Sequence, residues 1–511
     1  MKQLSKVISA ALAGLEALPV ETEVDIGAGL PALTVVGLPD KAVEEAKERV
    51  RSAVRNSGAI IPNRRITINL APADIKKEGP SYDLPMAIGI LAADGQVPSG
   101  FFDDMLLIGE LALDGTVRPV SGVLSIALAA RRWPEVKAMM VPSANANEAA
   151  LVRGVPIYAV NNLREVIRAA RGEISIKPLE HRVPDAEAMQ TANFDFADVK
   201  DQANAKRALE IAAAGHHNIL MSGPPGSGKT MLARALSGIL PPLGLEEMLE
   251  VTQLYSVTGA LRGGKLIHHR PFRSPHHTTS SVALVGGGTV PKPGEISLAH
   301  KGVLFLDEFP EYPRSVLEAL RQPLEDRVVT VSRAQGAVTF PADFVLVASQ
   351  NPCPCGYLGD PVKNCICSPY QVQKYQKRVS GPLLDRIDLH VEVPRIKYDK
   401  MVGDDDKLES SETVRCRVAS ARARQAERLG AARTSSQMTN AEIKKFCEVD
   451  EAGDKLLRRA VDTLNLSGRG YTRVLKLART IADLSASERI TTDHLAEALQ
   501  YRTQNNKEGG L

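Results

Sequence analysis

The chain has 511 residues, more than a single hydrophobic core holds, because such cores stop growing at roughly 250–300 residues. Its 63 Lys and Arg residues nearly balance its 60 Asp and Glu residues, and the net charge of +3 excludes a strongly basic protein that coats nucleic acid nonspecifically. No apolar run reaches the length of a membrane span, and Glu16 interrupts the start of the chain where a signal peptide needs an apolar block. We therefore expect a cytoplasmic protein of several domains without a membrane segment.

In the first third of the chain, apolar and polar residues alternate as they do in half-buried β-strands. The alternation covers residues 21–26, 32–36 and 65–70, and stretches with helical periodicity separate these runs. The pattern predicts a mixed α/β unit over residues 1–172. A polar, proline-bearing stretch without periodicity follows, and it predicts a linker at residues 173–190.

The central part of the chain has the pattern of a doubly wound α/β domain. A helical pattern (204–214), an apolar run (218–222), a Gly-rich turn and a second helical pattern (229–240) follow one another. Two further apolar runs are short and rich in Val, Leu and Phe, as buried strands of parallel sheets are; they cover residues 302–306 and 343–349. We expect a doubly wound parallel sheet within residues 191–395.

The last part of the chain, residues 396–511, is charged and rich in Ala. Its apolar residues have helical periodicity over residues 410–428, 440–464, 471–484 and 492–501. No comparable strand pattern occurs there, so we expect a small helical domain.

One glycine-rich segment matches the phosphate-binding P-loop pattern G-x-x-x-x-G-K-S/T in full. It consists of Gly223, Pro224, Pro225, Gly226, Ser227, Gly228, Lys229 and Thr230. The segment lies between a predicted strand and a predicted helix, which is the context that the pattern requires. We expect its backbone N–H groups to bind the phosphates of ATP, Lys229 to reach the β- and γ-phosphate oxygens, and the Thr230 hydroxyl to hold Mg²⁺.

Two carboxylates follow the apolar run 302–306 directly. A strand of a parallel sheet would deliver Asp307 and Glu308 to its carboxyl end, beside the P-loop. Asp307 suits Mg²⁺ binding, and Glu308 is placed to polarise the water that attacks the γ-phosphate. On its own such a pair is more often a solvated loop, but the P-loop upstream favours the catalytic interpretation.

Together these motifs resemble the AAA+ ATPases, in particular the magnesium-chelatase-like branch and the ComM family of bacterial competence proteins, over nearly the whole chain. The resemblance implies an N-terminal Lon-protease-like α+β domain (1–172), a linker (173–190), an AAA+ domain (191–395) and a C-terminal helical lid domain (396–511). It also implies ATP and Mg²⁺ as substrate and cofactor.

The same resemblance implies roles for three polar residues. Asn351 matches the sensor 1 residue that ends the next strand, near the γ-phosphate. Arg386 matches an arginine finger that reaches the site of the neighbouring subunit, so it implies a ring, and we expect a homohexamer. Arg473 matches the sensor 2 arginine, with Arg479 as the second choice.

Basic residues on two predicted loops are candidates for DNA binding. Residues 328–339 alternate as a hairpin would and resemble the pre-sensor-1 hairpin of the minichromosome-maintenance helicases, with Arg333 at the tip. We expect Arg333 to contact the phosphate backbone of DNA in the ring pore. Four more residues would line the same side, unless they are ordinary solvated charges: Arg262, Lys265, Arg270 and Arg273. The histidines nearby match no standard metal-ligand spacing and favour packing or loop roles; they are His268, His269, His276 and His277.

Four of the six cysteines lie close together in the sequence. They form two C-x-C pairs, Cys353 with Cys355 and Cys365 with Cys367. Four thiols can bind Zn²⁺ tetrahedrally, although the usual C-x₂-C spacing is absent. Zinc and four free thiols in a reducing cytosol both remain open at this point.

Two further motifs suggest other functions. Residues 77–83 resemble the nucleophile motif of Lon proteases with Ser81 as the nucleophile, but Leu124 stands where the family's lysine base is expected. Residues 483–487 match the metal-dependent adhesion motif D-x-S-x-S, but too few residues follow to build the domain that this motif needs. Neither motif is expected to be functional.

The resemblance implies a ring-forming motor that uses ATP hydrolysis to move single-stranded or branched DNA through its pore. Its activity would be that of a helicase promoting branch migration of recombination intermediates during natural transformation. The alternatives are a magnesium-chelatase-type ATPase for metal insertion and an ATP-dependent peptidase or protein remodeller.

Overall fold

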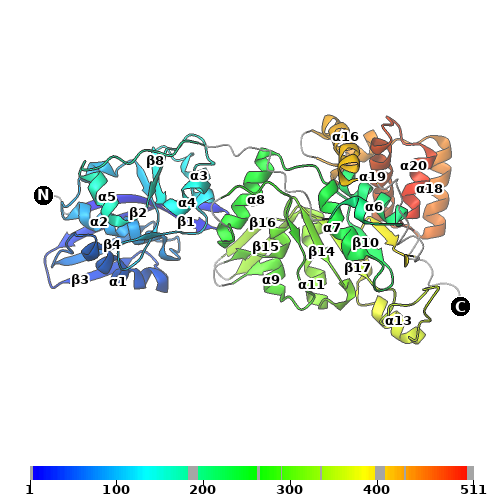
Figure 1. Cartoon of the computed structure of the whole chain (residues 1–511), viewed down its shortest axis with the longest axis horizontal. Helices are drawn as coiled ribbons and strands as arrows, with labels where there is room; N and C mark the ends of the chain where they lie inside the picture. Colours follow the sequence, from blue (N-terminus) through cyan, green and yellow to red (C-terminus); the bar gives the residue numbers. More distant parts are fainter. Residues whose placement is uncertain are drawn as a thin grey trace.

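An N-terminal α/β unit, a parallel sheet and a group of C-terminal helices follow one another along an elongated molecule (Figure 1). The computed structural model describes residues 4–181, 194–261, 265–288, 291–333, 336–396, 409–430 and 433–502. Arg262 and part of the predicted linker lie outside these residues. Within them, no helix combines the length and the apolar character that crossing a membrane requires.

A seven-stranded mixed sheet forms the N-terminal unit, in the order β3-β4-β2-β1-β5-β8-β9. β1 and β2 make a long antiparallel hairpin, β4 is antiparallel to β2, and the other neighbours are parallel. The strands span Leu4–Ala13 (β1), Glu16–Gly27 (β2), Ala32–Val36 (β3), Arg65–Ala71 (β4), Met105–Leu107 (β5), Ala138–Pro142 (β8) and Ile157–Val160 (β9), with a separate pair at Glu110–Leu111 (β6) and Val117–Arg118 (β7). The strands predicted from alternation are confirmed.

Helices cover both faces of this sheet because successive side chains of a strand point to opposite faces. In β1, Val7 and Ala11 pack with α1, α2 and α5, whereas Ala10 packs with α3 and α4. The helices span Lys41–Asn56 (α1), Asp83–Ala93 (α2), Val123–Ala130 (α3), Ser143–Ala149 (α4) and Leu163–Ala170 (α5). Asp40 begins α1 by accepting a hydrogen bond from the Val43 amide at 2.8 Å.

The central sheet has five parallel strands in the order β11-β14-β17-β10-β18. They span Phe272–Arg273 (β11), Val303–Leu306 (β14), Val345–Gln350 (β17), Ile219–Ser222 (β10) and Leu389–Glu392 (β18). The three predicted strands are confirmed, and β11 and β18 add one strand at each edge. The carboxyl ends of β10, β14 and β17 therefore meet at one edge of the sheet, where ligands bind in such folds.

Both faces of the central sheet are buried, as expected for parallel strands. Side chains such as Ile219 and Phe305 face a core shared with α6 (Ala203–Gly215) and α7 (Lys229–Ile239). Their neighbours Leu220 and Leu304 face a second core. On that side lie α8 (Leu245–Thr258), α9 (Ser281–Val285), α10 (Glu295–Leu298), α11 (Arg314–Ala319) and α12 (Arg321–Asp326).

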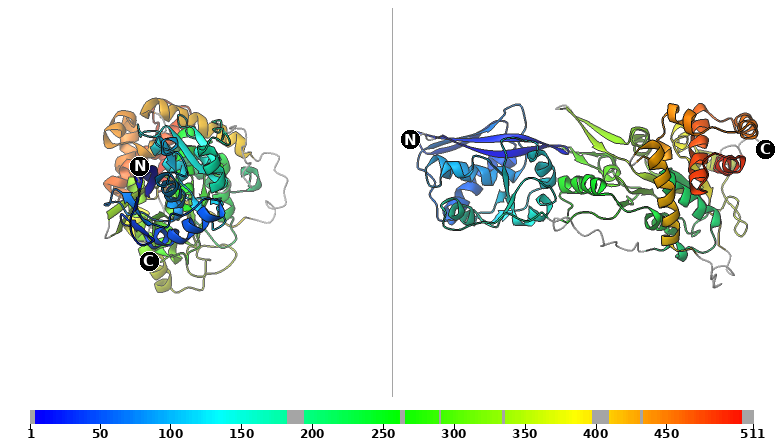
Figure 2. Two further views of the ribbon diagram at one scale, coloured as in Figure 1. Left: turned by 90° about the vertical axis from the view of Figure 1, so that its left-hand side faces the viewer. Right: turned by 90° about the horizontal axis from the view of Figure 1, so that it is seen from above.

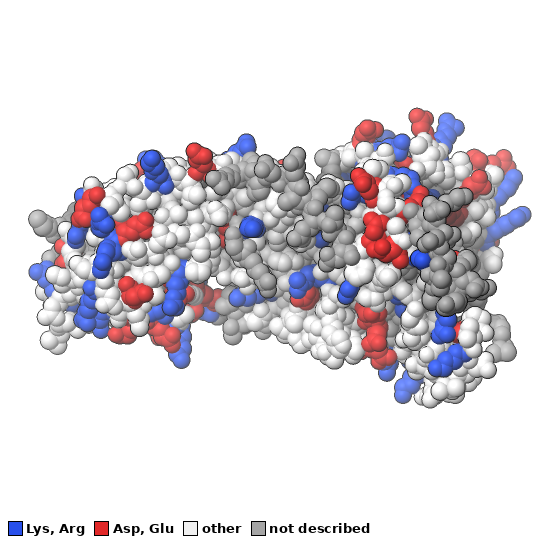
Figure 3. Space-filling model, viewed as in Figure 1, with Lys and Arg blue, Asp and Glu red and all other residues white. Residues whose placement is uncertain are grey.

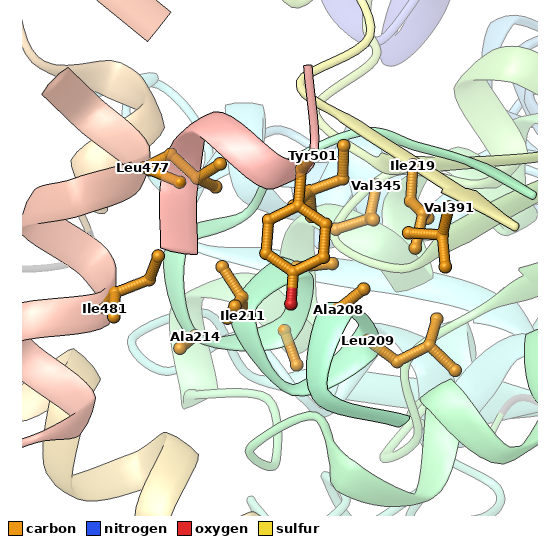
Figure 4. Close-up of a cluster of buried hydrophobic side chains, with 14 of the residues drawn as sticks. Ala208, Leu209, Ile211, Ala214, Ile219, Val345, Val391, Leu477, Ile481 and Tyr501 are labelled. Atoms are coloured by element: carbon orange, nitrogen blue, oxygen red, sulfur yellow. The ribbon is translucent and has the colours of Figure 1, made fainter. Parts of the chain in front are cut away.

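The C-terminal helices share the core of the sheet. They span Ser411–Leu429 (α16), Asn440–Phe446 (α17), Glu451–Leu464 (α18), Gly468–Leu484 (α19) and Thr492–Gln500 (α20). Figure 4 shows Leu477 and Ile481 of α19 and Tyr501 near Leu209 and Ile211 of α6, in one continuous apolar cluster. These helices therefore rest on α6 and on one face of the sheet.

One predicted helix, residues 440–464, is in fact two. α17 ends at Phe446, and Asp450 begins α18 by accepting a hydrogen bond from the Gly453 amide at 2.7 Å. The helical spacing of apolar residues continues from α17 into α18, but this capping interaction starts a new helix at Glu451. Asp483, the first residue of the adhesion-type motif, is buried and paired with Arg428 (2.6 Å) and Arg479 (3.0 Å). It therefore acts as a structural ion-pair partner.

The predicted hairpin at residues 328–339 is also confirmed. β15 (Val328–Arg333) pairs antiparallel with β16 (Gly336–Pro341), and Arg333 lies opposite Gly336 at the tip. A smaller pair, β12 (Gly286–Gly287) with β13 (Lys292–Pro293), follows α9, and two short helices, α13 (Pro369–Gln376) and α14 (Gly381–Leu384), precede β18.

The N-terminal unit meets the central part of the chain through the β1–β2 hairpin and α3. Figure 2 shows this hairpin extending toward β15 and β16, and the tight approach of Gly14 to Val338 leaves no room for a Cβ. The Gln253 side chain of α8 donates to the Leu15 carbonyl at 2.8 Å. The Ser256 hydroxyl donates to the buried carboxylate of Glu148, whose pKa burial raises. The two units are therefore joined by specific contacts.

Candidate active site

The P-loop lies between β10, the strand flanked by β17 and β18, and the N-terminus of α7. Gly226 (φ +76°) and Gly228 (φ +92°) adopt the left-handed backbone that glycine favours. A Cβ on Gly223 would collide with the Val393 carbonyl, so only glycine fits where the loop leaves the sheet. The loop thus has the backbone and the helix N-terminus that phosphate binding requires.

The side chain of Lys229 folds back onto the P-loop. Its Nζ donates to the carbonyls of Gly223 (2.7 Å) and Pro224 (2.9 Å) and to the Asn351 side chain (3.4 Å). Burial lowers the pKa of Lys229, and the nearby Asp307 partly opposes this effect. Asn351, at the end of β17, reaches Lys229 because β17 and β10 are neighbours. The structure therefore brings the P-loop lysine and the predicted sensor 1 residue together.

The predicted Mg²⁺ ligands also meet. The Thr230 hydroxyl donates to Asp307 at 3.1 Å, and the Ser349 hydroxyl of β17 donates to the other carboxylate oxygen of Asp307. Hydroxyl and carboxylate oxygens are the ligands that Mg²⁺ prefers, so this pair fits the ion. Ser349 was not predicted, since a serine inside an apolar strand carries no distinctive spacing signal.

Glu308 has a strained backbone and an unexpected partner. Its φ of +51° is unusual for a residue with a side chain, and its amide donates to Asp307 at 3.0 Å. Its carboxylate, half exposed, lies 3.1 Å from Nδ1 of His277. Strain of this kind often marks functional sites. The sequence predicted a packing or loop role for His277, and only the fold brings it to Glu308.

The two predicted arginines lie together, in a pocket away from the P-loop. Arg386 is buried, pairs with Glu325 at 2.8 Å, and its Nε has no hydrogen-bond partner among the described residues. Arg473 pairs with Asp388 at 3.1 Å. Both guanidinium groups line one pocket with Arg327. Within the described part of the chain, no hydrogen bond or ion pair joins either arginine to the P-loop.

Burial raises the pKa of Asp388, but Arg473 and His217 more than reverse this and hold the pKa well below its ordinary value. Arg479, the second choice for sensor 2, donates to the carbonyls of Glu488 (2.7 Å) and Ser487 (2.5 Å) inside the helical region. Its guanidinium group therefore stabilises the helical region.

Two of the arginines predicted to contact DNA have partners within the chain. The Arg270 side chain is only 9% exposed and is held by the Pro241 and Lys301 carbonyls and by Glu247. Arg273 forms two hydrogen bonds of 2.6 Å with Glu295. Both arginines belong to the packing around β11, and their contact with DNA stays a prediction. Lys265 is exposed, and the backbone of Arg333 lies at the hairpin tip.

Among the described residues, none bonds to the Ser81 hydroxyl of the Lon-like motif as a base would. Lys77 is fully buried and donates to the Pro72 carbonyl, and no hydrogen bond joins it to the Ser81 hydroxyl in the described chain. Leu124, at the position of the family's lysine, is buried in α3. A serine without a base is a weak nucleophile.

Three family models cover most of the chain. The model described as magnesium chelatase, subunit ChlI, matches residues 195–401, the model for subunit ChlI of Mg-chelatase matches residues 22–145, and the model for the ChlI C-terminal part matches residues 408–502. These matches agree with the parallel sheet and the nucleotide site.

Two relatives match over nearly their whole length, and a third matches over a shorter part. Competence protein ComM of Haemophilus influenzae is 45% identical over 506 residues, which cover 98% of this chain and 97% of the relative. The uncharacterized protein YifB of Escherichia coli is 44% identical over 500 residues, with 98% and 97% covered. The magnesium-chelatase 67 kDa subunit of Chlorobaculum parvum is 30% identical over 162 residues, with 31% of this chain and 23% of that protein covered. The chain therefore belongs to the ComM/YifB family of magnesium-chelatase-like AAA+ proteins.

Proposed function

We propose that this protein is an ATP-driven ring motor that moves DNA strands, with ATP sites completed between neighbouring subunits. The observation that carries the proposal is the separation of Arg386 and Arg473 from the P-loop of their own chain. An ATPase site needs positive charge against the γ-phosphate in the transition state. With both arginines in a pocket away from their own P-loop, a second copy of the chain is the natural source of that charge.

The residues at the P-loop divide the chemistry between them. The backbone amides and Lys229 would bind the phosphates, and Asn351 would orient the γ-phosphate. Thr230 and Asp307 would hold Mg²⁺, which supplies charge that stabilises the phosphate oxygens when it is bound. Glu308 would take a proton from the attacking water, with His277 fixing the position of its carboxylate.

The contacts of the Arg386 guanidinium group leave it able to bind a phosphate of a neighbouring subunit. The side chain is held by Glu325 and by the Pro382 carbonyl (2.6 Å), while Nε remains free of a hydrogen bond in the described chain. A γ-phosphate of the neighbouring subunit would offer more negative charge than Glu325 and would compete for the guanidinium. We expect a hexamer, as the resemblance to ring ATPases implies.

Binding of DNA is proposed for the pore hairpin. On the face shown in Figure 3, Lys and Arg side chains are interspersed with Asp and Glu, and the net charge of the chain is only +3. The described residues of this face therefore form no broad basic surface, and contact with DNA would be local. Arg333 at the tip of β15–β16 and the exposed Lys265 are the proposed phosphate contacts.

The cellular role is proposed from the relative of Haemophilus influenzae, which is named a competence protein. A motor that moves branched DNA would promote branch migration of recombination intermediates during natural transformation.

The test is ATPase activity with and without single-stranded, duplex and branched DNA. The proposal expects stimulation by single-stranded or branched DNA, a steep fall of DNA affinity with salt, and strand movement that requires ATP hydrolysis. Lys229→Ala serves as the control, since it should abolish hydrolysis. An ATPase rate that no DNA changes, together with no measurable DNA binding, would contradict the proposal.

A metal-insertion ATPase is the second candidate, favoured by the magnesium chelatase family models. The relative that is named a magnesium-chelatase subunit matches only 31% of this chain, whereas the ComM relative matches 98%. A chelatase would ignore DNA, so the same ATPase measurement separates the two candidates.

A further inference from the structure

Four cysteine thiols converge next to the sensor 1 residue. The Sγ atoms of Cys353, Cys355, Cys365 and Cys367 all lie within 4.8 Å of one another. The Cys353–Cys355 distance is 3.4 Å, and Cys365 lies 3.6 Å from each of these two sulfurs. Zn–S bonds of about 2.3 Å place the corners of a tetrahedron about 3.8 Å apart, close to these distances. We propose that this cluster binds one structural Zn²⁺ ion.

The alternatives to a metal fit less well. A disulfide requires an S–S distance of about 2.05 Å, and each of these cysteines is free. An iron–sulfur cluster also uses four thiolates, but its several iron and sulfide ions would hold the cysteine sulfurs farther apart than a single ion does. An all-sulfur, four-ligand set with this compact spacing is the closed coordination of structural zinc sites.

The backbone is arranged to stabilise thiolates. The Cys355 amide donates to the Cys367 sulfur at 3.4 Å, and the Cys367 amide donates to the Cys365 sulfur at 3.4 Å. Backbone N–H groups of Ile366 and Tyr357 also donate to the Cys355 sulfur. Zinc ligands must be deprotonated, and amide donors around sulfur favour that form.

The segment 353–367 has little else to hold it. It contains no helix or strand, and of its residues, all of which are described, only Cys353 and Gly356 are buried. Its apolar side chains point outward instead of forming a core: Ile366 is 87% exposed and Val362 is 74% exposed. Small units without a core usually depend on a disulfide or a metal. A Zn²⁺ ion would supply this missing cross-link.

The position of the site connects it to ATP hydrolysis. Asn351 lies two residues before Cys353, and Gly356 approaches Pro225 of the P-loop so closely that a Cβ would lie 2.6 Å from the proline ring. The Gln376 side chain of α13 donates to the Pro352 carbonyl at 3.5 Å. Zinc would therefore fix the loop that borders both the P-loop and sensor 1, with the ion outside the catalytic centre.

The experiment measures the metal content of the full-length protein, purified without chelators, by mass spectrometry. We expect one zinc ion per chain in the wild type and in the control Cys416→Ser, whose thiol is exposed on α16. Cys365→Ser should lose the zinc. If that variant fails to fold, Cys367→His should keep a metal, and its cobalt-loaded form should have the spectrum of three sulfur ligands and one nitrogen ligand. Iron in place of zinc would overturn the choice of metal.

The proposal fails if the wild type holds no metal and all four thiols react with a thiol reagent as fast as Cys416. Removal of zinc from intact protein should lower the ATPase kcat about 10-fold or more, because a displaced catalytic group costs rate steeply. Metal content is read without DNA, so its outcome is independent of whether the chain is a DNA motor.

Discussion

At the scale of residues, the nucleotide site combines the carboxylate of Glu308 with the hydroxyl of Thr230. Thr230 and Glu308 stand 78 positions apart in the sequence. Asp307 links them, because it accepts hydrogen bonds from the Thr230 hydroxyl and from the Glu308 amide. Asp307 can reach Thr230 because β14 and β10 end at the same edge of the sheet. In the proposed mechanism, one carboxylate at this edge binds the metal and the other acts on the water. His277 lies 3.1 Å from the second carboxylate and is the group proposed to position it.

Replacement of His277 tests this assignment. We expect His277→Ala to lower kcat about 10-fold while leaving ATP affinity unchanged, because a carboxylate that loses its positioning partner works less well as a base. Glu308→Gln should lower kcat by at least about 100-fold with binding retained. Steady-state ATPase rates and nucleotide titrations measure both effects. His181→Ala is the control, since His181 bonds to Arg153 and to the Ala150 carbonyl in the N-terminal unit; an equal loss in both histidine variants would contradict the positioning role.

Asp388 gives a prediction for pH. Its pKa in the folded protein lies below the ordinary value of about 3.9, so the stabilisation from its carboxylate is fully present above that pH and is lost as the pH falls toward the folded-state pKa. Asp388→Asn should destabilise the protein by about 3–5 kcal/mol at neutral pH, since it leaves Arg473 and His217 without their partner. Urea unfolding midpoints should show this difference shrinking below about pH 4. A difference that is the same at pH 7 and pH 3 would contradict the assignment.

At the scale of elements, periodicity predicted part of the fold: β2, β3 and β4 of the N-terminal sheet, β10, β14 and β17 of the central sheet, and α6, α7, α16, α19 and α20. The hairpin β15–β16 was predicted from its alternation, and β10 and α7 from an apolar run and a helical pattern on either side of the P-loop. β18 was missed because His390 and Glu392 interrupt its apolar residues, whereas β10 and β14 are apolar runs. The division of residues 440–464 into α17 and α18 was missed because a cap depends on one side chain.

The tip of that hairpin carries the proposed DNA contact. Arg333→Ala should abolish most of the stimulation of ATPase activity by DNA and leave the basal rate unchanged, because the hairpin is built from strands outside the sheet that carries the P-loop. The slope of DNA affinity against salt should also become less steep by about one phosphate contact per subunit. Arg459→Ala, an exposed arginine of α18, is the control. Unchanged stimulation in Arg333→Ala would contradict the role of the hairpin.

At the scale of the whole molecule, the arrangement of units was harder to predict than the units themselves. The buried pair Glu148–Ser256 and the contact of Gly14 with Val338 join residues from different units, and no sequence pattern connects them. The burial of Arg270 has the same cause, since its partners come from three separate segments. Local patterns therefore predicted the nucleotide site, whereas contacts between segments required the structure.

The junction between the units can be tested through Ser256. Ser256→Ala should lower the stability of the junction by about 1–3 kcal/mol, because the buried Glu148 carboxylate loses a hydrogen bond. Limited proteolysis and thermal unfolding would measure this effect. Ser237→Ala is the matched control, since its exposed hydroxyl bonds only to a carbonyl of its own helix; equal effects in the two variants would contradict a specific junction.

The central claim is that an ATP site is completed by the neighbouring subunit. Its most direct test mixes Lys229→Ala, which keeps Arg386 but cannot bind the phosphates, with Arg386→Ala, which keeps an intact P-loop. Each variant alone should be nearly inactive, and the mixture should regain ATPase activity, because some interfaces then combine an intact P-loop with an intact arginine. A mixture as inactive as its components, or an Arg386→Ala variant with full activity, would contradict the account.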